Sequence, residues 1–352
     1  MLNRYAAFVT ASTVLLIVAG GLVTSTGSGL AVPDWPTTYG WSMFTFPLDK
    51  MVAGIRYEHG HRLVATTVGM LTIVLTVWLW FSERRRWVRR LGVVALAAVC
   101  AQGLLGGLTV LLFLPAPVSI AHAGLAQIFF CLLVSITLFT SRSWETMGQR
   151  GPLDDGRLRV VASVTTLAIY LQILLGATMR HTEAGLAIPD FPLVFGGLFP
   201  PDWTAAIAIH YAHRVGALVV AGAILATAGH VWFHHRSVGW LTRPALLAIV
   251  LVLIQISLGG LTVLTRRAVS VNTAHVVTGA LLLATSLVIT LRSWRVRFAF
   301  IGPRGAPPPR AAVANAPELV SNDHPLPERT VPTSVATSAG ASRSCSAAGA
   351  RA

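Results

Sequence analysis

Long uncharged apolar segments constrain this chain more than any other feature. They recur along the first 300 residues, for example at 63–81, 245–264 and 276–289. An apolar segment of about 20 residues is long enough to cross a bilayer as a helix. Only 11% of the residues are charged, whereas a soluble domain averages about 25%. The sequence therefore predicts an all-α polytopic membrane protein and excludes a soluble enzyme and a secreted module.

The apolar segments predict eight transmembrane helices, and the first is expected to be a retained span because no cleavable signal peptide is evident. The expected ranges are 5–25, 61–81, 91–112, 119–140, 159–178, 211–232, 242–264 and 270–291. Arginines gather in alternate loops, at 82–90, 141–159 and 234–243, and after residue 291. The positive-inside rule then places these loops and both termini in the cytoplasm. The net charge of +14 reflects this topology, so no nucleic-acid partner is expected.

The two halves of the chain repeat each other at a spacing of about 152 residues. The loop at 29–36 matches 185–192, the segment at 58–62 matches 210–214, and the segment at 102–110 matches 255–263. Each half has four spans, an even number, so both halves enter the membrane in the same direction as a parallel repeat. We expect two four-helix bundles, at 1–140 and 159–297, joined by a cytoplasmic linker at 141–158 and followed by a disordered tail at 298–352.

Two histidines in each half begin apolar spans at equivalent positions, His61 and His122 in the first and His213 and His275 in the second. An ionisable side chain at membrane depth is costly without a partner and is a functional candidate. Two histidines per half are too few for a tetrahedral zinc site, but two neutral imidazoles suit the axial positions of a haem iron. Hydrogen-bonded core histidines are the alternative.

Other histidines are set aside. His59 and His181 are expected to be solvated near the outer loops, and the residues at 230, 234 and 235 are interpreted as interfacial charge at a helix end.

An acidic residue distinguishes the two halves. Glu58 lies three residues before His61 and on the same helix face, where it could transfer a proton or stabilise a developing positive charge. A surface carboxylate is the alternative. The second half has His210 at this position, so we expect one half to react and the other to hold a permanent haem. Arg62 and Arg214 could pair with haem propionates or, alternatively, with lipid phosphates.

Together these elements resemble the haem A synthase family over about residues 8–295. The resemblance implies oxidation of the C8 methyl of haem O to a formyl group, by successive hydroxylations with water-derived oxygen, to give haem A for cytochrome oxidase. It also implies that His213 and His275 ligate a permanent haem b, that His61 and His122 flank the substrate haem, and that Glu58 is the essential acid. The expected location is a bacterial plasma membrane.

The chain departs from this family at one place. Many bacterial relatives have two cysteines in the first outer loop, where this chain has Val32 and the pair Thr37-Thr38, so no disulfide is expected there.

The expected partners are haem O, membrane lipid, an unidentified electron acceptor, haem O synthase and cytochrome oxidase assembly factors, with a homo-oligomer left open. A di-haem electron carrier and a haem transporter or chaperone are the alternative functions.

Overall fold

The computed structural model describes residues 1–146 and 154–295. Part of the predicted linker and the whole predicted tail lie outside these residues. Eight helices are long and apolar enough to span a membrane, which confirms the predicted number. They are α1 (Leu2–Ser25), α2 (Ala53–Ser82), α3 (Arg86–Leu111), α4 (Ala116–Phe139), α6 (Gly156–His181), α7 (Ala205–His235), α8 (Gly239–Leu264) and α9 (Val269–Ser293). Three short helices accompany them: η1 (Leu48–Lys50), α5 (Arg142–Thr146) and η3 (Ala184–Leu186).

Two spans begin well before the apolar segments that predict them. Helix α2 starts at Ala53, eight residues earlier than expected, and α7 starts at Ala205, six residues earlier. Hydropathy misses these first turns because they contain charged and polar side chains. The side chains are tolerated because the preceding long loops, at 26–52 and 182–204, supply their hydrogen-bond partners. We call these the outer loops, after the side of the membrane that the sequence predicts for them. As a result, Glu58 and His210 both lie inside helices.

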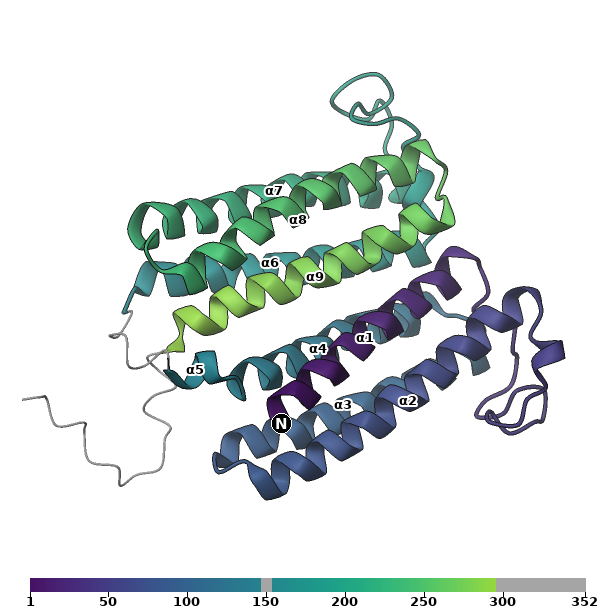
Figure 1. Ribbon diagram of the computed structural model, residues 1–352. Coiled ribbons are helices and arrows are strands. Elements are labelled where there is room, and N and C mark those ends of the chain that lie inside the picture. Colours follow the sequence, from purple (N-terminus) through teal and green to yellow (C-terminus); the bar gives the residue numbers. More distant parts are fainter. Residues whose placement is uncertain (147–153, 296–352) are drawn as a thin grey trace, which may run out of the picture. The chain divides into compact units, whose positions relative to one another are not determined.

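The long helices pack as two sets of four. In the first set α1 and α3 each contact α2 and α4, and in the second α6 and α8 each contact α7 and α9 (Figure 1). Helices α2 and α4 therefore stand at opposite corners of the first set, as α7 and α9 do in the second. The sets meet through α1, α4, α6 and α9. These are the contacts that two four-helix bundles require, and the parallel symmetry of the sets stays a prediction.

The closely packed apolar core fills only one end of each set. In the first set it runs from Ala6 on α1 to Leu79 on α2 and Leu133 on α4, and in the second it includes Ile224 on α7 and Val252 on α8. A smaller cluster joins the two sets. Most of these residues lie in the halves of the helices that are remote from the long loops at 26–52 and 182–204, and Val252 lies near mid-helix. Residues nearer those loops are left for other contacts.

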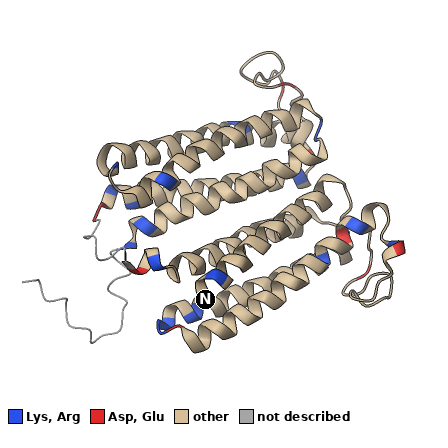
Figure 2. Ribbon diagram, in the orientation of Figure 1, with Lys and Arg blue, Asp and Glu red and all other residues tan. Residues whose placement is uncertain are grey.

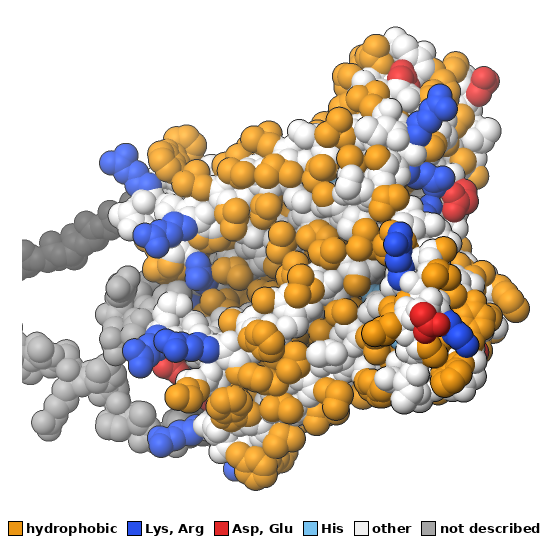
Figure 3. Space-filling view, turned by 45° about the vertical axis from the view of Figure 1, so that its right-hand side comes forward, with side chains coloured by type: hydrophobic (Ala, Val, Ile, Leu, Met, Phe, Trp, Pro, Cys, Tyr) orange, Lys and Arg blue, Asp and Glu red, His pale blue; other side chains and the backbone are white. Residues whose placement is uncertain are grey.

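Charged and apolar residues separate along the helices. Most charged residues lie toward the two ends of the helices (Figure 2). Hydrophobic side chains cover the surface between them (Figure 3). Large apolar residues on this surface are at least half exposed, for example Leu15, Ile73, Leu218 and Leu253. In water such a surface would be unfavourable, whereas in a bilayer it faces lipid, so the chain is a multi-pass membrane protein.

Candidate functional site

Each of the four predicted histidines lies against a glycine of a neighbouring helix. A Cβ atom placed on these glycines would come 2.9–3.2 Å from the histidine Cε1. The pairs are Gly20 with His61, Gly106 with His122, Gly176 with His213, and Gly259 with His275. A contact of 3.0–3.4 Å is tighter than nine in ten real Cβ contacts, so glycine is the residue that lets the Cε1 edge of each imidazole come this close to the neighbouring helix. The same arrangement therefore occurs four times.

The second glycine of each Gly-Gly pair has a different neighbour. A Cβ on Gly107 would come within 2.6 Å of the Trp35 indole, and a Cβ on Gly260 within 2.6 Å of the Phe191 ring. Each aromatic residue belongs to the outer loop of its own half. In the repeated Gly-Gly motif, the first glycine therefore leaves room for a histidine. The second leaves room for an aromatic side chain of the loop that covers the same end of the helices.

Glutamine side chains contact the histidines of the two halves in different ways. In the second half, Gln172 Nε2 lies 3.1 Å from the Nδ1 of His213 and donates to its carbonyl at 2.7 Å, and Gln255 Nε2 lies 3.3 Å from the Nε2 of His275. In the first half, Gln102 donates only to the carbonyl of His122, at 2.9 Å.

These glutamines precede the facing glycines by four residues and so share their helix face. The position four residues before Gly20 is Leu16. Among the described residues, both second-half rings thus contact a glutamine amide and neither first-half ring does.

The histidine rings suit a planar iron-containing group. The Nδ1 atoms of His61, His122 and His275 are buried and have no hydrogen-bond partner within residues 1–146 and 154–295. A buried polar nitrogen without a partner is unfavourable. In each half the two histidines come from helices at opposite corners of the set, α2 and α4 in the first and α7 and α9 in the second. Paired imidazoles beyond the packed core fit a haem with two axial ligands. The roles of the four histidines as haem ligands stay predictions.

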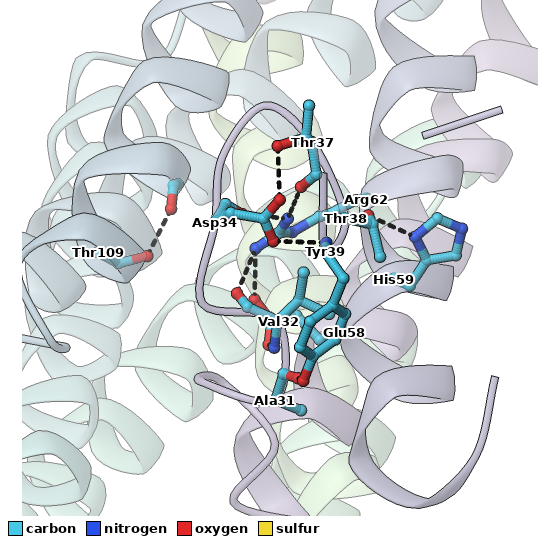
Figure 4. Close-up of polar contacts among 11 residues, drawn as sticks. Ala31, Val32, Asp34, Thr37, Thr38, Tyr39, Glu58, His59, Arg62 and Thr109 are labelled. Atoms are coloured by element: carbon cyan, nitrogen blue, oxygen red, sulfur yellow. Dashed lines mark hydrogen bonds and ion pairs between the residues drawn. The ribbon is translucent and has the colours of Figure 1, made fainter. Parts of the chain in front are cut away.

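The carboxylate of Glu58 attaches the first outer loop to α2 (Figure 4). It is 3% exposed. One oxygen accepts the Val32 backbone N–H at 2.8 Å, and the other pairs with Arg62 Nη2 at 2.7 Å. The Arg62 guanidinium also donates to the carbonyls of Val32, Asp34 and Thr37 at 2.7–2.9 Å. Charge-assisted hydrogen bonds of this kind contribute about 1.5–3 kcal/mol each, so the Glu58–Arg62 pair fixes the loop over the helix end that bears His61.

The second half repeats this attachment with an imidazole. Ile188 N lies 3.2 Å from His210 Nδ1, and Arg214 Nε lies 3.2 Å from His210 Nε2. Arg214 also donates to the carbonyls of Ile188, Asp190 and Leu193. A neutral imidazole has one lone pair and accepts only one of these N–H groups, whereas a carboxylate accepts both. The Glu-to-His difference therefore changes the strength and the charge of the attachment while keeping its form.

An aspartate organises the tip of each outer loop. Asp34 accepts N–H groups from Tyr39 and Gly40, and Asp190 accepts those of Phe195 and Gly196. The Gly196 N–H is the main reason that the pKa of Asp190 is below its usual value. Burial alone would raise the pKa of Asp34, but hydrogen bonds led by the Gly40 N–H lower it overall. The matching loops thus adopt matching turns.

Some functional contacts were not expected from the sequence. The interpretation of His59 as solvated is wrong: it is 1% exposed, its Nδ1 lies 2.9 Å from the Thr38 hydroxyl, and its ring packs on Phe46. It is buried because α2 starts early and the outer loop folds over its first turn. Arg62 and Arg214 use most of their N–H groups on loop carbonyls, and their pairing with propionates stays a prediction.

A signal for the glutamine role was present in the sequence. Gln precedes Gly by four residues in three spans, and Leu takes that position in the fourth. Only the structure shows that histidines face these residues.

Fold and site together define a polytopic membrane protein with a duplicated pair of intramembrane histidines. Residues 3–287 match the model of a family described as cytochrome oxidase assembly protein. The chain is 28% identical to a haem A synthase of Geobacillus kaustophilus over 280 residues, which are 78% of this chain and 86% of the relative.

Two further relatives give the same result. The chain is 30% identical to a haem A synthase of Shouchella clausii over 271 residues, 76% of this chain and 88% of the relative. It is 27% identical to one of Alkalihalophilus pseudofirmus over 292 residues, 82% and 96% of the two chains. The chain belongs to the haem A synthase family of cytochrome oxidase assembly proteins.

Proposed function

We propose that the protein is a haem A synthase, an oxidoreductase that converts the C8 methyl of haem O to a formyl group for cytochrome oxidase. The observation that carries this proposal is the inequality of the two histidine pairs. Among the described residues, glutamine amides contact both rings of the second pair, and a buried carboxylate precedes the first histidine of the first pair by three residues, where the second half has His210. A carrier with two equivalent permanent haems requires neither difference.

The second half supplies the permanent cofactor site. His213 and His275 would hold haem b, which supplies one-electron redox chemistry when bound. Contacts with neighbouring residues orient metal-ligating histidines. The side-chain amides of Gln172 and Gln255 lie against the two rings and limit their rotation. The first half lacks these contacts, and His61 and His122 would flank haem O less rigidly, as is needed for a substrate that must leave as product.

Oxidation of a methyl to a formyl group consumes one water and releases four protons and four electrons. The electrons go to an acceptor that is an unidentified partner. Protons need a nearby base, and Glu58 is the carboxylate on the helix that carries His61. It is held by the Val32 N–H and by Arg62. Proton uptake by Glu58 would weaken both contacts, so proton transfer and release of the outer loop are coupled at one residue.

The topology follows from the arginines. We propose that the end of the helices with the N-terminus and the arginine-rich connections faces the cytoplasm of a bacterial cell, by the positive-inside rule. The loops that cover the histidines then lie on the outer side. Haem O synthase and cytochrome oxidase assembly factors are the proposed neighbours, since one makes the substrate and the others use the product.

The test is expression in a host that makes haem O but no haem A, followed by extraction of the pigments. Haem A or its hydroxylated precursor is expected with the wild-type chain. Glu58→Gln keeps the shape of the side chain and removes its charge, so we expect loss of product with the second-half haem retained.

Glu83→Gln is the matched control, because Glu83 lies at the other end of α2 and pairs with Arg85. Haem-bound wild-type protein without product would refute the enzyme and favour a carrier or a transporter. Normal turnover by Glu58→Gln would refute its role as the acid.

A further inference from the structure

Three side chains with metal-ligating atoms meet at the end of α7 that is remote from the outer loops. The Nε2 atoms of His230 and His235 lie 2.8 and 2.7 Å from one oxygen of Asp155. All three atoms lie within 4.8 Å of one another. The helix-end position predicted from the sequence is confirmed, because α7 ends at His235. The structure adds a partner that the sequence does not predict, a carboxylate shared by His230 and His235.

The local fold brings these residues together. His230 and His235 lie in the last turns of α7, and Asp155 is the N-cap of α6, where its other oxygen accepts the Leu158 N–H at 2.9 Å. The three side chains are only 14–19% exposed. The capping contact and the two imidazole contacts hold the Asp155 carboxylate in place.

We propose that Asp155, His230 and His235 form a binding site for a divalent transition-metal ion of the Zn²⁺ class. Zinc is commonly bound by imidazole nitrogen and carboxylate oxygen at about 2.0–2.2 Å, with three protein ligands and one open position. Tetrahedral ligands at that radius are about 3.4 Å apart. The present N···O distances of 2.7–2.8 Å need to widen by only about 0.6 Å.

Metal entry replaces the protons shared between the rings and the carboxylate, since the ligand must be a neutral imidazole and binding releases protons. The ion would join the start of α6 to the end of α7. The site is independent of the haem site, because residues 213 and 230 are separated by roughly 26 Å along a helix that rises 1.5 Å per residue.

The experiment is calorimetric titration of Zn²⁺ into the full-length, metal-free protein in detergent, purified without a histidine tag. We expect one saturable Zn²⁺ per chain and at least tenfold weaker binding in His230→Gln, His235→Gln and Asp155→Asn. The last variant keeps an oxygen that can cap α6, so it tests the ligand set with little risk to folding.

His234→Gln is the matched control. It lies between the two ligands in sequence, is exposed, and its Nδ1 contacts the His230 carbonyl. We expect its Zn²⁺ affinity to equal that of the wild type. The proposal is overturned if the wild type shows no stoichiometric Zn²⁺ binding, or if Asp155→Asn binds as tightly as wild type with the same helical circular dichroism.

Discussion

Substituting alanine for Gly176 tests whether the histidine–glycine contacts position a cofactor. A Cβ at this residue would lie 2.9 Å from the Cε1 of His213. Ordinary contact begins at 3.4 Å, so the imidazole must move by about 0.5 Å. Overpacking of this kind costs about 1–3 kcal/mol, and a displacement of about 0.5 Å is the limit for a functional ligand geometry. We expect Gly176→Ala to weaken haem binding in the second half by roughly tenfold, which corresponds to about 1.4 kcal/mol.

The assay is the haem content per purified chain, with the electron paramagnetic resonance spectrum of the bound haem as a report on its axial ligands. Gly222→Ala is the matched control, because Gly222 is an exposed glycine of α7 and a Cβ added to it would meet nothing within 4 Å. Alanine there should keep the haem and raise helix stability by up to about 1 kcal/mol. Equal haem content and identical spectra for Gly176→Ala and wild type would refute the reasoning.

Three further outcomes are expected. Gln172→Leu, which copies the residue found at position 16, should increase the dissociation rate of the second-half haem by about 10–100-fold; an unchanged rate would show that the amide only braces the helix. Arg62→Lys should speed amide hydrogen exchange at residues 31–39, since an ammonium cannot replace the several fixed contacts of a guanidinium; unchanged exchange would mean that Arg62 does not hold the loop. Asp190 has a lowered folded pKa, so its contribution to stability is complete above the unfolded value of about 3.9 and is lost as pH falls through the folded pKa. The difference in thermal unfolding between wild type and Asp190→Asn should therefore be constant above about pH 5 and shrink in acid; a difference that grew in acid would contradict this sign.

The number and approximate positions of the spans could be predicted, because a bilayer requires long apolar helices. The starts of α2 and α7 could not, because Glu58, His59 and Arg62 are polar and enter a helix only with partners from the outer loop. The same limit applied to His230 and His235. Their hydropathy and position indicate a helix end, and the partner that turns them inward is 75–80 residues away.

By itself, the sequence determined that the chain is an eight-span membrane protein and that its halves repeat. It also predicted a site from four histidines and one unmatched glutamate. These properties depend on composition, periodicity and spacing, which need no knowledge of neighbours. Only the tertiary structure decided which glycine each histidine faces, which rings a glutamine reaches, and that Glu58 holds a loop. Such contacts join residues far apart in the chain, and they depend on helix rotation and loop path, which a one-dimensional pattern leaves open.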